Sequence, residues 1–151
     1  MTGAVTDNAN GQVGTYTFPI GTTTITYTAT DASNRTATSS LTVTVTDDED
    51  PTVAASGNVT ANTSDDGTGD CTVDIAITDA TFADNCTGSS IAYAMTGATT
   101  VASTNGQVGT ATFEIGTTTI TYTVTDGANR TATSTMTVVV TDDEDLSLIH
   151  I

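Results

Sequence analysis

The chain has 151 residues, of which 18 are acidic and only two, both arginine, are basic. The formal net charge of −16 repels phosphate backbones and anionic membrane surfaces, which argues against nucleic-acid partners and makes cations natural ones. The sequence has no apolar run of membrane-spanning length, and its 40 threonines favour strands over helices. We therefore expect an all-β protein.

A long segment of the chain is present twice. Residues 11–50 recur as residues 106–145 with 32 of 40 positions identical, at an offset of 95 residues. That offset is about the length of one small β-sandwich, so the chain is expected to be part of a tandem array. It divides into the C-terminal half of a truncated repeat with its acidic linker, residues 1–50, and a complete repeat, residues 51–145.

The start of the chain aligns with the middle of the complete repeat. Met1-Thr2-Gly3 matches Met95-Thr96-Gly97 after a one-residue gap. We therefore expect residues 1–50 to lack the first strands of their repeat and to leave open sheet edges. The alternative is a genuine half-repeat that a strand from another chain completes.

In the complete repeat, apolar and polar residues alternate with the period of a strand. Segments rich in Ser, Asp, Asn and Gly at 64–70, 84–88 and 126–129 separate these runs and predict turns. About seven short strands with turns at this spacing indicate an immunoglobulin-like β-sandwich. The residues expected to point inward are Val73, Ile75, Ile77, Ile91, Tyr93, Met95, Phe113, Ile115, Ile120, Tyr122, Val124, Met136, Val138 and Val140.

The last six residues, 146–151, match nothing else in the chain. The hexapeptide LSLIHI resembles the translation of a sequencing-adaptor end, so we expect a non-native tail; an apolar tail strand is the alternative. The only histidine of the chain belongs to this tail.

Several motifs resemble those of the hyalin repeat (HYR) family. They are FPIGTTTITYTATD at 18–31 and FEIGTTTITYTVTD at 113–126, together with TAT at 36–38 and LTVTVTDDEDP at 41–51. The resemblance implies immunoglobulin-like modules that occur in tandem in extracellular proteins and act in cell adhesion. Asn-Arg stands before each TAT where the family usually has Gly-Asn, so the geometry of that turn is open.

The resemblance also bears on the cysteines. Many relatives carry four cysteines, and this chain has Ala55 and Ser134 at two of those positions. Their joint absence is expected of a bonded pair, which implies a disulfide between the remaining Cys71 and Cys86. Closing a loop of about 15 residues would stabilise the fold by roughly 3 kcal/mol. Two unbridged thiols are the alternative.

Acidic residues gather where one repeat meets the next. In an immunoglobulin-like sandwich, the B–C and F–G loops, with Asp84 and Asp126, lie at the end where the linker carrying Asp47, Asp48 and Asp50 enters. Carboxylate oxygens are ligands that Ca²⁺ prefers, so these five residues form a hypothetical interdomain calcium site. A solvated acidic linker without bound metal is the alternative.

No constellation of catalytic residues is present, since the chain has no lysine and no histidine outside the tail. We expect a non-enzymatic spacer or adhesive stalk of a secreted or surface-anchored bacterial protein, with neighbouring repeats as its partners. The alternative is an accessory module that binds a protein or carbohydrate ligand through the B–C and F–G loops.

Overall fold

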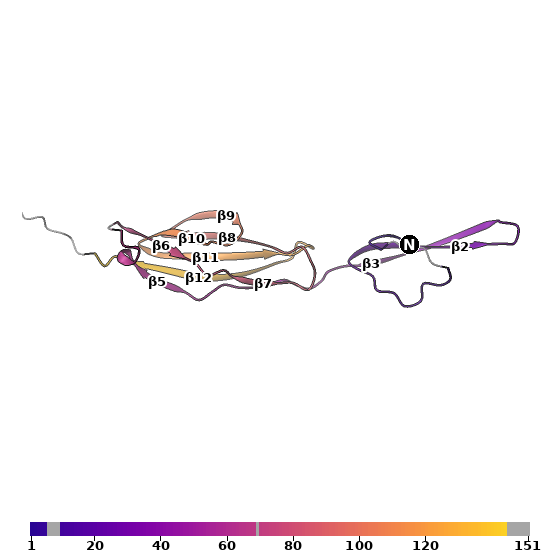
Figure 1. Cartoon of the computed structure of the whole chain (residues 1–151), viewed down its shortest axis with the longest axis horizontal. Coiled ribbons are helices and arrows are strands. Elements are labelled where there is room, and N and C mark those ends of the chain that lie inside the picture. The colour runs from indigo at the N-terminus through magenta and orange to yellow at the C-terminus, as the bar shows by residue number, and fades with distance from the viewer. Residues whose placement is uncertain (6–9, 69, 145–151) are drawn as a thin grey trace, which may run out of the picture. The chain divides into compact units, whose positions relative to one another are not determined.

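The computed structural model describes residues 1–5, 10–68 and 70–144. Within these ranges the chain consists of strands, turns and one short 3₁₀ helix, so the expected all-β fold is confirmed (Figure 1). The chain forms two compact units, Met1–Asp48 and the residues from Glu49 onward, which are described separately. The expected non-native tail, 146–151, lies outside the described residues.

The first unit is a small antiparallel sheet in the order β1-β2-β3. Its strands are β1 (Thr2–Gly3), β2 (Gly21–Thr30) and β3 (Thr36–Val45). Gly3 pairs with Thr23, and in the second unit Gly97 pairs with Thr118, which lies 95 residues after Thr23. The strand pairing therefore follows the alignment with its one-residue gap.

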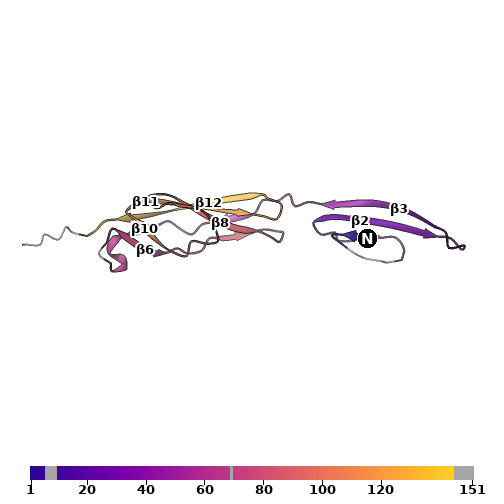
Figure 2. The same cartoon turned by 90° about the horizontal axis from the view of Figure 1, so that it is seen from above.

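The second unit contains a five-stranded sheet in the order β5-β12-β11-β8-β9 and two strand pairs, β4–β7 and β6–β10. All pairings are antiparallel except that of β5 with β12. The strands lie roughly along one common axis (Figure 2). Their bounds are β4 (Thr52–Ala54), β5 (Val59–Asn62), β6 (Thr72–Ala76), β7 (Thr81–Ala83), β8 (Ser90–Gly97), β9 (Val101–Asn105), β10 (Thr110–Glu114), β11 (Gly116–Thr125) and β12 (Thr131–Thr141), with the helix η1 (Thr63–Asp66) between β5 and β6.

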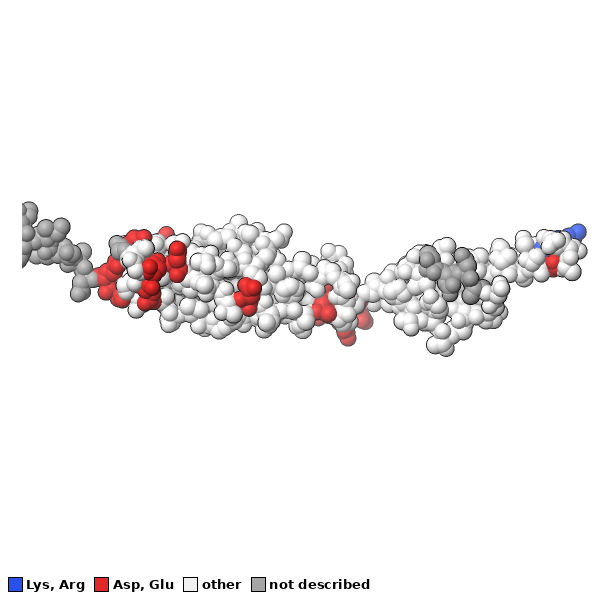
Figure 3. Space-filling model, in the orientation of Figure 1, with Lys and Arg blue, Asp and Glu red and all other residues white. Residues whose placement is uncertain are grey.

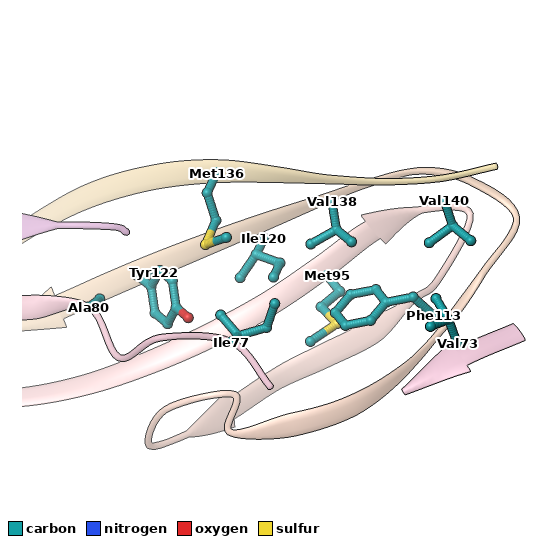
Figure 4. Packing of buried hydrophobic residues seen from close by; sticks show 10 residues of the cluster. All are labelled: Val73, Ile77, Ala80, Met95, Phe113, Ile120, Tyr122, Met136, Val138 and Val140. Carbon is teal, nitrogen blue, oxygen red and sulfur yellow. The ribbon is translucent and has the colours of Figure 1, made fainter. Parts of the chain in front are cut away.

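A single apolar cluster holds the second unit together. Side chains of β8, β11 and β12, which belong to one sheet, point towards those of β6 and β10, so both layers contribute to it (Figure 4). Burial of apolar surface at this scale is the main stabilising term in a domain of this size. The buried members are Val73, Ile77, Ala80, Met95, Phe113, Ile120, Tyr122, Met136, Val138 and Val140.

Most residues expected to point inward do so. Ile75, Ile91 and Tyr93 are partly buried against the cluster. Ile115 is the exception, with 41% of its surface exposed, because β10 ends at Glu114 and the chain turns into β11 at Gly116. The alternation rule does not hold past the end of a strand.

The expected disulfide between Cys71 and Cys86 is wrong: the structure has no bond between them. Cys71 precedes β6, whose first residue pairs with Glu114 next to the start of β11. Cys86 follows β7, whose last residue pairs with Thr52 at the other end of the unit. The chain between the two cysteines runs along the length of the unit, so they cannot approach to the Cα separation of under about 7 Å that a disulfide needs.

The other two positions considered with the cysteines lie side by side. The backbone N–H of Ala55 donates to Oγ of Ser134 at 3.0 Å. These two positions are thus close enough for a bonded pair, as their joint replacement suggested. Cys71 and Cys86, by contrast, lie at opposite ends of the unit.

In the described part of the chain, no helix has the length and apolar character needed to cross a membrane.

Candidate cation site and linker contacts

The polar contacts of the second unit with the linker residues lie at its two ends. We call the end with Glu49 and Asp50 the leading end, and the end where β12 finishes the trailing end. Acidic side chains gather towards both ends of this unit (Figure 3). The tight turn between β11 and β12 lies at the leading end.

Asp126 builds that turn. Its Oδ1 accepts the backbone N–H groups of Ala128 and Arg130, each at 2.8 Å. Asn129 has φ 67°, a left-handed conformation that asparagine tolerates better than most residues. The Asn-Arg pair that departs from the usual Gly-Asn therefore places its asparagine at the position of positive φ.

A second loop packs against this turn. A Cβ atom on Gly127 would lie 3.2 Å from the carbonyl oxygen of Thr87, so the backbones of the two loops are close. In the second loop, Oδ2 of Asp84 accepts the N–H of Cys86 at 3.2 Å. The packing brings Asp84 and Asp126 together, with carboxylate oxygens within 4.8 Å of one another.

Each of these carboxylates has one buried oxygen without a hydrogen bond in the described part of the chain, Oδ1 of Asp84 and Oδ2 of Asp126. Asp126 as a whole is only 4% exposed. Buried carboxylate oxygens are normally satisfied by donors or by a cation. The pair is therefore suited to hold a hard cation.

The linker residues Glu49 and Asp50 contact the same end of the unit. The side-chain amide of Asn85 donates to Oε2 of Glu49, and Nη1 of Arg130 lies 2.7 Å from Oδ1 of Asp50. Asp50, expected as a calcium ligand, thus forms an ion pair with an arginine. Asp47 and Asp48 belong to the first unit. Their part in a calcium site remains a prediction.

At the trailing end, the second copy of the linker is attached to η1. Oδ2 of Asp143 accepts the hydroxyl of Ser64 at 2.7 Å, and Oδ1 accepts the N–H of Ser64 at 3.2 Å. The hydroxyl bond from Ser64 is the main reason why the pKa of Asp143 lies below its usual value. Sequence reasoning missed this contact, which joins two positions 79 residues apart.

Residues 3–45 match the HYR domain. This confirms the family resemblance over those residues. HYR domains are non-catalytic modules that occur in extracellular proteins. No protein with a curated description matches the chain.

Proposed function

On the premise of this HYR domain, we propose that the chain is a piece of a spacer or adhesive stalk. Tandem immunoglobulin-like repeats would form the stalk in a secreted or cell-surface bacterial protein and present its other domains. The partners of each repeat are its neighbours in the same chain. The extracellular occurrence of HYR domains and the all-β fold support this proposal.

The sheet order of the second unit supports an immunoglobulin-like assignment. In such folds one sheet carries the C, F and G strands and the other carries A, B and E. The order β5-β12-β11-β8-β9 corresponds to A′-G-F-C-C′, with β6–β10 as B and E. The parallel β5–β12 edge fits a first strand that crosses between the sheets.

The observation that carries the spacer role is how the acidic linker is attached. The second unit binds the last two linker residues, Glu49 and Asp50, at its leading end. At its trailing end it binds Asp143, which occupies the position of Asp48 in the second linker copy. In an array, each linker would therefore be fixed to the repeat that it leaves and to the repeat that it enters.

The chain also enters and leaves the second unit at opposite ends. β12 alone has 11 residues, which correspond to roughly 36 Å of extended strand. Repeats joined in this way add length with each copy. Short, anchored linkers would keep that length from being lost to bending.

Ligand binding through the 84–88 and 126–129 loops is the second role we considered. These loops hold Glu49 and Asp50 through Asn85 and Arg130. The same polar groups would have to leave the linker to bind a protein or sugar. The contacts therefore favour the spacer role.

Small-angle X-ray scattering tests the proposal on the full chain extended after Asp145 by one, two or three copies of residues 51–145. A spacer predicts that the maximum dimension grows by a constant step of about 40 Å per copy. The matched variant carries Asn85→Ala and Arg130→Ala in every complete copy, and its step should be shorter. Growth that levels off with copy number in the unsubstituted series would rule out a spacer.

A further inference from the structure

The Asp84–Asp126 pair has a feature that the turn and the linker do not explain. The turn uses Oδ1 of Asp126 and leaves Oδ2 buried without a donor. Asp84 likewise uses Oδ2 for the N–H of Cys86 and leaves Oδ1 buried without a donor. Two negative groups with unsatisfied buried oxygens and close contact repel each other unless a cation lies between them.

The first unit supplies an internal comparison for Asp126. Asp31 occupies the equivalent position and its Oδ1 accepts the N–H groups of Ser33 and Arg35 at 2.8 and 2.9 Å. Asp31 is nevertheless exposed. The turn thus forms without burying the aspartate, so the burial of Asp126 comes from surroundings that Asp31 lacks.

We propose that Asp84 and Asp126 provide the carboxylate ligands of a Ca²⁺ site at the leading end of the second unit. The site stands on the geometry of these two loops and does not depend on the spacer role. A single Ca²⁺ ion with ligands at 2.3–2.6 Å accommodates two oxygens up to about 5 Å apart, and the oxygens here lie within 4.8 Å.

The ligand chemistry selects the ion. Carboxylate oxygens suit calcium and magnesium, whereas zinc prefers sites with nitrogen and sulfur ligands. Magnesium requires nearly ideal octahedral geometry, while calcium accepts irregular shells of six to eight oxygens. Two irregular loops can supply such a shell with their carbonyl oxygens and water. Calcium sites of extracellular modules commonly have a Kd of about 10⁻⁴–10⁻³ M.

Thermal melting of the full chain tests the site, with Ca²⁺, Mg²⁺ or NaCl at matched ionic strength and with EDTA as the reference. We expect Ca²⁺ at about 10 mM to raise the melting temperature of the second unit by about 5 °C or more, because a bound ligand stabilises the folded state. The rise with Mg²⁺ or NaCl should be much smaller.

Three substitutions locate the effect. Asp84→Asn and Asp126→Asn keep an oxygen acceptor and remove the charge, so each should abolish most of the calcium shift. In EDTA both variants should melt at or above the temperature of the unsubstituted chain, because the repulsion is relieved. Asp31→Asn is the matched control and should keep the full shift. An equal shift with Mg²⁺, or a calcium shift that survives Asp84→Asn, would overturn the proposal, as would no shift at all.

Discussion

Residues 21–45 and 116–140 have closely similar sequences and form the same hairpin, yet their surroundings differ. In the second unit Ile120, Tyr122 and Val124 are fully buried. The equivalent residues of the first unit, Ile25, Tyr27 and Ala29, range from buried to exposed. The strand pairing and the turn are the same in both. A hairpin is thus specified locally, whereas the burial of its faces is not.

The difference arises from what lies over the hairpin. In the second unit β5 and β8 flank β12 and β11 in the same sheet, and residues of the β6–β10 pair pack against them in the core. Among the described residues of the first unit, only the two-residue strand β1 pairs with β2 on the side away from β3. The stability lost when a side chain is truncated grows with the burial of that side chain. The same substitution in the two copies should therefore lower stability by different amounts.

The largest difference in stability loss between the two copies is expected for alanine substitutions of Met136 and Leu41. Met136 is 1% exposed and Leu41 is 46% exposed. Met136→Ala should lower the free energy of unfolding by about 2–5 kcal/mol, because it leaves a cavity in the core. Leu41→Ala should lower it by about 0.5 kcal/mol or less. Urea denaturation of both variants measures the difference, and similar losses would show that the exposed face of β3 is covered in solution.

A smaller contrast is expected between Gly97 and Gly3. Both have φ 105°, and a Cβ atom on either would collide with the carbonyl oxygen of its neighbour, Thr117 or Thr22. Gly97→Ala should cost about 1–3 kcal/mol, since β8 is fixed inside a five-stranded sheet. Gly3→Ala should cost less, because β1 is short and can move away. Melting temperatures of the two variants provide the comparison.

Tyr122 and Tyr27 differ at the hydroxyl. The hydroxyl of Tyr122 is buried and has no hydrogen-bond partner in the described part of the chain, while Tyr27 is half-buried. Tyr122→Phe should therefore be neutral or stabilise the second unit by about 1 kcal/mol. Tyr27→Phe should change stability by only a few tenths of a kcal/mol. A loss of more than 1 kcal/mol in Tyr122→Phe would indicate a hydrogen bond to water.

The buried phenol of Tyr122 also predicts that the stability of the second unit depends on pH. Burial, followed by the charge of Asp79 and the proximity of Tyr93, raises the pKa of Tyr122 above its ordinary value. The folded state thus favours the neutral phenol. The contribution of this phenol to the free energy of unfolding is complete below about pH 10 and is lost as the pH rises through the folded pKa. Urea midpoints between pH 9 and 11.5 should fall more steeply for the unsubstituted chain than for Tyr122→Phe.

The smallest change in stability is expected in the turn of the hairpin, which has the same conformation in both copies. Asn34 and Asn129 have φ 60° and 67° in turns with the same hydrogen bonds. Asn34→Gly and Asn129→Gly should each change stability by only about 0.5 kcal/mol, because glycine relieves the strain but costs chain entropy. Hydrogen exchange of the hairpin amides can follow each copy. A large effect in one copy alone would show that its turn depends on tertiary contacts.

Much of the second unit could be predicted from the sequence because strand alternation and turn residues act over a few positions. The inward faces of β11 and β12 follow directly from that pattern. That Cys71 and Cys86 stay unbridged could not be predicted, because it depends on which ends of the unit two distant loops reach. The attachment of Asp143 to Ser64 spans 79 residues and has no local signal either.

By itself, the sequence determined the repeat period, the all-β character, the strands of the doubled hairpin and the aspartate–asparagine turn. These depend on local alternation and backbone preferences that both copies share. Only the tertiary structure decided that Asp126 is buried beside Asp84 while Asp31 is exposed, and that Met136 is in a core while Leu41 is not. The physical reason is that desolvation and packing depend on segments far away in the chain, and in the described ranges only the second unit has those segments around its hairpin.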